Sequence, residues 1–340
     1  MKIWILLLSL LFLKCNGDIS KDFKLSILKK NKKYTPNDTI RFNLFNKKNH
    51  PIDSVVYQLE GQKVDDVHPL KLFKPGIYNL TASVYVSGIK SKYSKNITIV
   101  SPVKPKLYTY TIVNEFPHDK TAYTQGLEFY QDTLYESTGI RGKSSLRKVD
   151  FETGKVLQKV DLDNVYFGEG ISILNDKVYQ LTWQANIGFQ YKPDQLKMER
   201  SFAYMDSKEG WGLCNDGQNL YKSDGTHQIW ILDGNTQKEI DKIQVMTDKN
   251  PLEKINELEW VEGKIYANTY QFKKEVGIII NPQSGIVEGV IDFSGLKSKV
   301  EQVSNLDVLN GIAYHPKRKT FFITGKNWSK LFEVKVNIKP

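Results

Sequence analysis

Hydrophobic and polar residues alternate along much of the chain, in short stretches separated by turn-forming residues. The clearest alternation places Leu80, Ala82, Val84 and Val86 on one side of a strand that follows a Pro-Gly turn. A period of two is typical of a β-strand with one buried face. The pattern predicts five strands, at residues 23–28, 39–45, 54–59, 76–86 and 93–100. About 80 residues of this kind favour a small immunoglobulin-like β-sandwich over residues 20–101.

From residue 107 onward, one pattern recurs five times: a polar or aromatic residue, a turn-permitting residue that is glycine in four copies, and an apolar residue. The copies lie about 44, 42, 45 and 54 residues apart. We call the first residue of each copy the slot residue; the five are Gln125, Glu169, Trp211, Asn256 and Asn310. An apolar or aromatic pair follows each slot residue by nine to eleven positions. Two sequence features that recur with nearly constant spacing from each other indicate a structural repeat.

Each repeat holds four predicted strands, which is the content of one β-propeller blade. The fold class is therefore predicted as all-β, with a five-bladed β-propeller over residues 107–340 preceded by the sandwich. The fifth unit ends one strand short. Residues 108–113 alternate suitably and are expected to complete it, so that the ring closes without a free edge.

The first residues read as an export signal. A charged start and an apolar run over residues 5–13, too short to span a membrane, predict a signal peptide at 1–19. Cys15 follows the run directly and is expected to carry a lipid, as in a bacterial lipoprotein; the alternative is a conventional signal and a secreted protein. We expect an exported protein of the periplasm or cell envelope, with residues 102–106 as the linker between the two domains.

The net charge of +10 is uneven. Residues 20–106 carry 17 Lys and Arg against 6 Asp and Glu, whereas residues 107–340 carry 29 against 31. The lysines of the first module lie in apparent loops, without aromatic residues at regular intervals between them. We therefore interpret this basic surface as a solvated face; the alternative is that it binds an anionic membrane. An exported protein gives no reason to expect nucleic acid as a partner. The second cysteine, Cys214, has no disulfide partner if Cys15 is acylated, and is interpreted as a core residue.

Side chains at the slots differ although their neighbours repeat, which is what a site placed on a regular scaffold produces. A second set follows on the adjacent strands and includes Trp183, Tyr270 and Lys326. Together they offer one carboxylate, aromatic walls, amides and a cation, an inventory suited to binding a small polar group. The five histidines are isolated, without the spacing of metal ligands, so no metal or other cofactor is expected.

These residues also form motifs that resemble those of one family, the plant and bacterial (papaya-type) glutaminyl-peptide cyclotransferases. The motifs are Tyr123-Thr124-Gln125-Gly126-Leu127, Phe167-Gly168-Glu169-Gly170, Gln180-Leu181-Thr182-Trp183, Glu209-Gly210-Trp211-Gly212-Leu213, Asn256-Glu257-Leu258-Glu259, Leu309-Asn310-Gly311-Ile312 and Thr324-Gly325-Lys326-Asn327-Trp328. The resemblance covers residues 107–340 in order, and it leaves residues 20–106 outside.

The resemblance implies a five-bladed propeller that converts the N-terminal glutamine of peptides or proteins into pyroglutamate, with release of ammonia and without zinc. It places the catalytic acid/base on Glu169 and the substrate-binding residues on Gln125, Trp183, Trp211, Asn256 and Lys326. Tyr123 stands where Phe is common in the family, and Tyr270 where Trp is common; both stay aromatic and join the predicted pocket.

Cyclisation needs a neutral α-amine, a stabilised oxyanion and a proton for ammonia. Glu169 is expected to serve the first and last needs, with a pKa raised by its aromatic neighbours. Lys326, Asn256 and Gln125 are candidates for holding the amide and polarising its oxygen, with their division of labour left open. The alternative is a non-catalytic cell-surface propeller that binds peptide N-termini or another small ligand. The oligomeric state is left open.

Overall fold

The computed structural model describes residues 19–28 and 33–339. Cys15 and nearly all of the predicted signal peptide lie outside the described residues. Strands make up almost all of the regular structure, with two short 3-10 helices, η1 (Ile19–Asp22) and η2 (Lys297–Lys299). The prediction of an all-β protein is confirmed. Among the described residues, no helix has the length and apolar character needed to cross a membrane.

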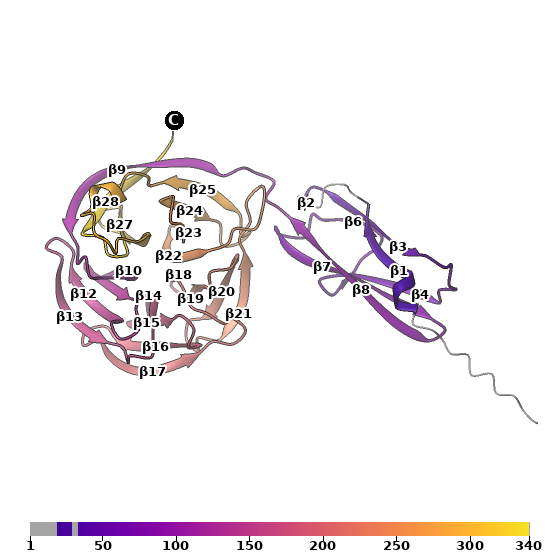
Figure 1. Cartoon of the computed structure of the whole chain (residues 1–340), viewed down its shortest axis with the longest axis horizontal. Coiled ribbons are helices and arrows are strands. Elements are labelled where there is room, and N and C mark those ends of the chain that lie inside the picture. The colour runs from indigo at the N-terminus through magenta and orange to yellow at the C-terminus, as the bar shows by residue number, and fades with distance from the viewer. Residues whose placement is uncertain (1–18, 29–32, 340) are drawn as a thin grey trace, which may run out of the picture. The chain divides into compact units, whose positions relative to one another are not determined.

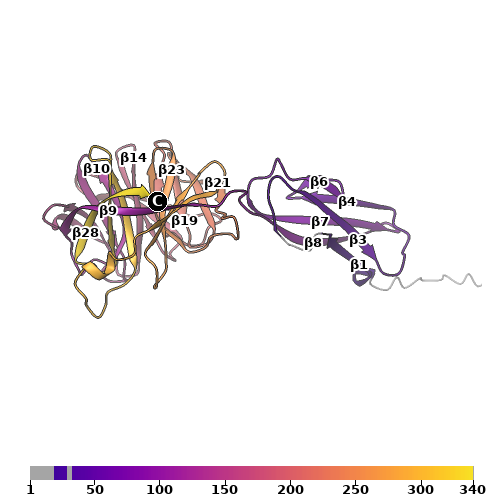
Figure 2. The ribbon, with the colours of Figure 1, turned by 90° about the horizontal axis from the view of Figure 1, so that it is seen from above.

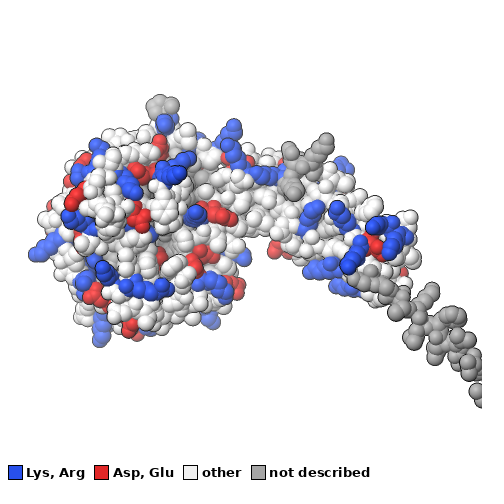
Figure 3. Space-filling view, viewed as in Figure 1, with Lys and Arg blue, Asp and Glu red and all other residues white. Residues whose placement is uncertain are grey.

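Contacts within the chain divide it into two compact units. Of the described residues, the first comprises 19–28, 38–70 and 78–97; the second comprises 33–37, 71–77 and 98–339. The predicted linker at 102–106 stays a prediction. Figure 3 shows lysine and arginine dominating the visible charge of the first unit, whereas both signs are mixed over the second.

The strands of the N-terminal region form two sheets. One has the order β1 (Phe23–Ile27), β3 (Thr39–Asn46), β6 (Val67–Pro69); the other has the order β2 (Lys33–Tyr34), β8 (Ile89–Ile99), β7 (Gly76–Val86), β4 (Ser54–Leu59), β5 (Gln62–Lys63). Phe23 from the first sheet packs with Val84 and Val86 from the second. The alternating apolar residues of 76–86 thus lie in the core, and Thr81 and Ser83 on the other face of β7 are buried as well.

Strand β8 begins at Ile89 rather than at residue 93 as predicted. Ser87 and Gly88 connect it to β7, with φ values of 49° and 77°. Two consecutive residues with positive φ form the tight hairpin turn whose twist matches that of paired strands. Pairing therefore starts directly after the turn, ahead of the apolar alternation that identified the strand.

The second unit is a ring of four-stranded antiparallel arrays. Three of them are separate sheets: β10 (Thr124–Tyr130), β11 (Thr133–Thr138), β12 (Ser145–Asp150), β13 (Lys155–Asp161); β14 (Gly168–Leu174), β15 (Lys177–Thr182), β16 (Ile187–Lys192), β17 (Lys197–Ala203); and β18 (Leu213–Asn215), β19 (Asn219–Ser223), β20 (Gln228–Asp233), β21 (Glu239–Gln244). Figure 1 shows the first strand of each nearest the centre of the ring and the fourth strand outermost.

The other two arrays are joined into one eight-stranded sheet. Its order is β22 (Ile255–Val261), β23 (Lys264–Thr269), β24 (Val276–Ile280), β25 (Val287–Asp292), β9 (Lys106–Pro117), β28 (Lys330–Ile338), β27 (Thr320–Gly325), β26 (Leu309–His315). Strand β9 pairs with β28 in antiparallel fashion and, at its start, with β25 in parallel fashion. Figure 2 shows β9 running along the near edge of the ring. The prediction that residues 108–113 complete the fifth array is confirmed, and the strand is longer than predicted.

The repeated glycine exists because neighbouring inner strands touch through their backbones. A Cβ at Gly170 would lie 2.6 Å from the backbone nitrogen of Leu213, and one at Gly126 would lie 2.6 Å from that of Ile171. Apolar side chains fill the space between adjacent arrays, where Cys214 is fully buried. The interpretation of Cys214 as a core residue is confirmed.

Candidate active site

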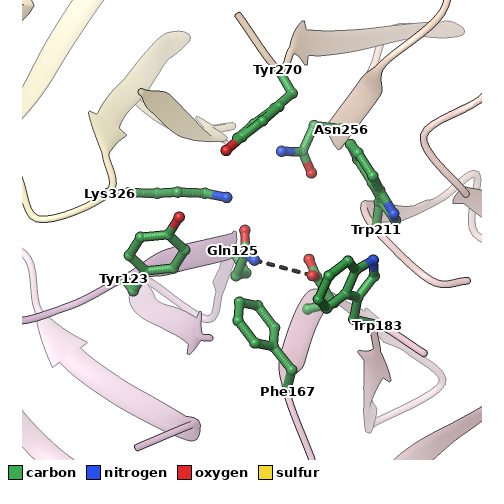
Figure 4. A pocket seen from close by; sticks show the side chains of 9 residues that line it. Tyr123, Gln125, Phe167, Trp183, Trp211, Asn256, Tyr270 and Lys326 are labelled. Carbon is green, nitrogen blue, oxygen red and sulfur yellow. Dashed lines mark hydrogen bonds between the residues drawn. The ribbon is translucent and has the colours of Figure 1, made fainter. Parts of the chain in front are cut away.

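Nine side chains from all five arrays enclose a cavity of about 230 Å³ at the inner strands (Figure 4). They are Tyr123, Gln125, Phe167, Glu169, Trp183, Trp211, Asn256, Tyr270 and Lys326. All eight residues predicted for the pocket are among them, so the structure brings the whole predicted set together. The cavity is smaller than the roughly 300–1,000 Å³ of sites for drug-sized ligands. It suits a single side chain.

β-Bulges at the slots aim these side chains inward. The pairing of the inner strand with its neighbour shifts between Thr124 and Gly126, and again between Gly168 and Ile171. Corresponding shifts occur between Ile255 and Leu258 and between Leu309 and Ile312. A bulge inserts an extra residue and re-aims its side chain. Four slot residues therefore leave the regular alternation of their strands.

The pocket has a polar floor and an aromatic rim. Gln125, Glu169, Asn256 and Lys326 are at most 5% exposed, whereas the five aromatic residues are partly exposed. Figure 4 shows Lys326 entering from the side opposite Trp183 and Trp211, with the amides of Gln125 and Asn256 pointing toward the centre. A ligand must therefore pass the rings before it reaches the charged groups.

Burial raises the pKa of Glu169 well above its usual value, because a carboxylate loses its hydration there. The charge of Lys326 acts in the opposite direction, and Glu209 adds to the rise. Gln125 Nε2 donates to Glu169 Oε1 at 3.1 Å, which favours the ionised form. Burial thus favours the protonated carboxyl group, whereas Lys326 and Gln125 favour the carboxylate.

A chain of amides fixes Gln125 in this orientation. Asn268 Nδ2 donates to Asn310 Oδ1 at 2.9 Å, and Asn310 Nδ2 donates to Gln125 Oε1 at 3.1 Å. The oxygen of Gln125 is thereby occupied, and its nitrogen faces Glu169. Asn310, a slot residue outside the predicted pocket, acts on the pocket through Gln125.

Lys326 is held between two tyrosine rings. Its Nζ lies 4.7 Å from the ring centroid of Tyr123 and 5.0 Å from that of Tyr270. Burial lowers its pKa, while Glu169 and Asp307 raise it. Tyr123 donates its hydroxyl hydrogen to Asp307 Oδ2 at 2.7 Å, which fixes the ring. The two π faces favour the charged ammonium in a site with little water.

One carboxylate ties the two tryptophans together. Trp183 Nε1 and Trp211 Nε1 both donate to Glu209 Oε2, at 2.8 and 2.9 Å. Phe167 packs edge-on against Trp183, with ring centroids 5.6 Å apart. The rim is therefore a connected set of rings with fixed orientations.

Asn256 carries a buried side-chain oxygen, Oδ1, without a hydrogen-bond partner among the described residues. A buried acceptor without a donor is costly, by about 1–3 kcal/mol. Its position in the pocket lining indicates that a ligand with an N–H group satisfies it.

The sequence prediction omitted Phe167, Glu209, Asp307 and Asn310. The repeat itself contained the signal for two of them. Tyr123 lies two residues before its slot, and the same offset in the next two repeats gives Phe167 and Glu209. An asparagine before a glycine is usually a turn residue, so Asn310-Gly311 does not by itself indicate a pocket residue. Asp307 lies in a loop outside the repeat landmarks.

No group of three or more His, Cys, Asp or Glu residues in the described part of the chain is arranged to hold a metal ion. The side chains that line the pocket offer one carboxyl group with a raised pKa, an ammonium group, amides that donate and accept, and aromatic walls. That set can move a proton and hold a polarised amide.

Comparisons with known proteins agree on one family. The family model for glutamine cyclotransferases matches residues 80–336. A glutaminyl-peptide cyclotransferase of Arabidopsis thaliana is 41% identical over 228 residues, which are 66% of this chain and 70% of that protein. The crystal structure of a glutaminyl cyclase from Myxococcus xanthus superimposes with a TM-score of 0.65 at 35% identity, covering 70% of this chain and 100% of that one.

Proposed function

The chain belongs to the glutamine cyclotransferase family, and we propose that it converts the N-terminal glutamine of peptides and proteins into pyroglutamate with release of ammonia. It is an enzyme, a glutaminyl-peptide cyclotransferase. The observation that carries the proposed mechanism is the buried carboxyl group of Glu169, whose pKa is raised by burial, in a pocket closed by aromatic rings.

In the first step, Glu169 as a carboxylate takes a proton from the α-ammonium group of the substrate. The substrate's positive charge favours the ionised carboxylate, which offsets the effect of burial. The neutral amine then attacks the γ-amide carbon and closes a five-membered ring. The carbonyl oxygen becomes an oxyanion. When the carbonyl group reforms, the bond to the amide nitrogen breaks, and Glu169 gives its proton to that nitrogen, which departs as ammonia. The ring nitrogen, which became positively charged on attack, returns its extra proton to the Glu169 carboxylate, and Glu169 releases it to solvent.

The other floor residues hold the reacting groups. Lys326 is the cation that opposes the negative charge on the oxyanion. The unpaired oxygen of Asn256 accepts an N–H of the substrate, which a glutamine with a free α-amine supplies. Gln125, with its oxygen bound to Asn310, acts as a donor near Glu169. The aromatic rim keeps the side chain curled, so that amine and amide meet.

Replacement of Glu169 by Gln tests the mechanism. The variant keeps the size of the side chain and loses the proton transfer, so we expect ammonia release from a Gln-initiated peptide to fall by about 10²–10⁴-fold. Circular dichroism checks that the variant folds. Turnover close to that of the wild type would overturn the role of Glu169. Absence of ammonia from the wild type would support the non-catalytic binding protein instead.

Metal independence is part of the proposal and rests on the described residues of the pocket, which provide an acid/base and a cation of their own. Wild-type activity is expected to survive dialysis against a chelator. Activity that is lost on dialysis and restored by a divalent cation would contradict it.

We assign the ring to the five-bladed β-propeller architecture and the N-terminal strands to an immunoglobulin-like sandwich. Five four-stranded arrays in chain order support the first assignment, and two facing sheets support the second. Limited proteolysis that cuts within residues 102–106 and leaves both fragments folded would support the proposed domain limits; cuts elsewhere would contradict them.

Export to the cell envelope with a lipid on Cys15 is the proposed location, and it rests on the residue pattern of positions 1–15. Attachment to the membrane would bring the enzyme to peptides outside the cytoplasm. Mass spectrometry of the mature protein decides between an acylated Cys15 at the N-terminus and a conventional cleavage site.

A further inference from the structure

A second cavity, of about 480 Å³, lies next to the pocket on the other side of Trp211. Trp211 lines both cavities, and Glu209, which holds the Trp211 indole, lines the second. The indole rests on Gly225, where a Cβ would come within 2.6 Å of its six-membered ring. The two cavities therefore share Trp211, whose indole has a fixed position.

The second cavity is acidic. Asp206, Glu209 and Asp224 line it, against one lysine, Lys208. None of the three carboxylates forms an ion pair within the described part of the chain, and all three are partly or fully exposed. Asp224 is fixed in place, because its Oδ2 accepts from Trp230 Nε1 at 2.7 Å. The charge of buried Lys222 also reaches Asp224, but Lys222 is ion-paired with Glu239, so three carboxylates against Lys208 leave a negative potential in the cavity.

Aromatic faces in the same cavity can also bind a cation. Trp230 lines it, but its ring is buried and already carries Lys242, whose Nζ lies 4.9 Å from the ring centroid. The indole available to a ligand is that of Trp211. A guanidinium group stacks on such rings and donates to carboxylates in the same plane.

A peptide bound by its first residue must continue past the rim. Consecutive Cα atoms lie about 3.8 Å apart, so the second residue lies within reach of Trp211, which lines both cavities. We infer that the second cavity is a subsite for the residue that follows the N-terminal glutamine, and that it selects arginine or lysine there. This inference rests on the proposed function. We call the cavity the second-residue subsite.

The test compares peptides of one common sequence that begin with Gln-Arg, Gln-Lys, Gln-Ala and Gln-Glu. Contacts of a cation with partly exposed carboxylates and one indole give roughly a 5- to 20-fold higher kcat/KM for Gln-Arg than for Gln-Ala. Gln-Lys should follow Gln-Arg, and Gln-Glu should be the poorest substrate. The ratio of kcat/KM for Gln-Arg to that for Gln-Ala should fall as salt is added, because the subsite is open to solvent.

Two single variants, Asp224→Asn and Asp206→Asn, locate the preference. Each keeps the shape of the side chain and removes one charge, so each should lower the Gln-Arg to Gln-Ala ratio by about 2- to 5-fold. Asp206 is exposed, which keeps the test valid if the change at Asp224 disturbs folding. Asp241→Asn is the control: Asp241 lies in β21, in the sheet that also contains Trp230, but outside the cavity, so its loss of charge should leave the Gln-Arg to Gln-Ala ratio unchanged.

The outcomes separate the two proposals. Turnover of all peptides with equal kcat/KM would overturn the subsite and leave the cyclotransferase intact, as would a ratio that neither Asp variant changes. Absence of ammonia from every peptide would overturn the proposed function and the subsite with it.

Discussion

At the scale of single residues, Glu209 links the geometry of the pocket to its proton chemistry. One of its oxygens holds the indoles of Trp183 and Trp211, and its charge raises the pKa of Glu169. A residue two positions before a slot thus fixes the walls and adjusts the acid/base.

Replacing Glu209 by Gln should separate these two effects. Without the neighbouring negative charge, the pKa of Glu169 falls, so Glu169 stays ionised to lower pH and the acid limb of the kcat/KM profile moves to lower pH. Weaker hydrogen bonds to the indoles should raise KM by about fivefold. Steady-state kinetics as a function of pH measures both. A profile at the wild-type position, with only KM changed, would contradict the electrostatic effect. Asp241→Asn again serves as the control for charge loss outside the pocket.

At the scale of elements, the inner strands combine a regular repeat with a local irregularity. Alternation and the step of about 44 residues were enough to predict the strands, the number of arrays and the slots. The bulges were not predictable, because the residues on both sides of a bulge are still apolar and the sequence does not show which residue is the extra one. The position of Phe167 two residues before a slot was the signal in the sequence, but the contact of its ring with Gly139 of the neighbouring array was not predictable.

The glycine of the repeat gives a prediction about stability. A Cβ at Gly170 meets backbone atoms of Trp211, Gly212 and Leu213, none of which can move independently. Gly170→Ala should therefore destabilise the ring by about 3 kcal/mol. The midpoint of urea unfolding, or failure to fold, measures the loss.

Gly263→Ala is the matched control. Gly263 has open space around it and a φ of +78°, so alanine costs only conformational strain of about 1 kcal/mol. Equal losses for the two variants would show that contact between the inner strands is not what requires Gly170.

At the scale of the whole molecule, buried glutamates join the arrays across the ring. Glu257 takes the place of glycine in the fourth repeat, and its carboxyl group accepts from the backbone nitrogens of Leu127 and Ile312, at 3.3 and 2.8 Å. Glu128 accepts from Ile173 at 2.9 Å. Burial raises the pKa of Glu128 to about 8, and raises that of Glu257 and Glu259 well above the usual value.

These shifts predict a stability that decreases with rising pH. An acid whose pKa is raised by folding stabilises the folded state below its unfolded pKa, and that contribution is lost as the pH rises through the folded pKa. For Glu128 the window runs from about 4.5 to about 8. The slope is at most about 1.4 kcal/mol per pH unit for one group. Tm measured from pH 5 to 9 should fall, and less steeply in Glu128→Gln.

Glu333→Gln provides the comparison. Its carboxyl group bonds to Arg318, which lowers the pKa of Glu333 to about 2, so it is ionised throughout the same window. Its replacement should lower Tm without changing the slope. A wild-type slope retained in Glu128→Gln would show that the central carboxyl groups do not govern the pH dependence.

The pairing of β9 with β28 also constrains how the protein is made. Residues 106–117 are synthesised early, yet their antiparallel partner is residues 330–338. The ring cannot close until the ribosome has completed that last strand, and contacts so distant in sequence form slowly. Until then β9 lacks its antiparallel partner, and an unpaired strand edge of this kind invites aggregation. The last strand of the ring to be synthesised is therefore the one that covers this edge.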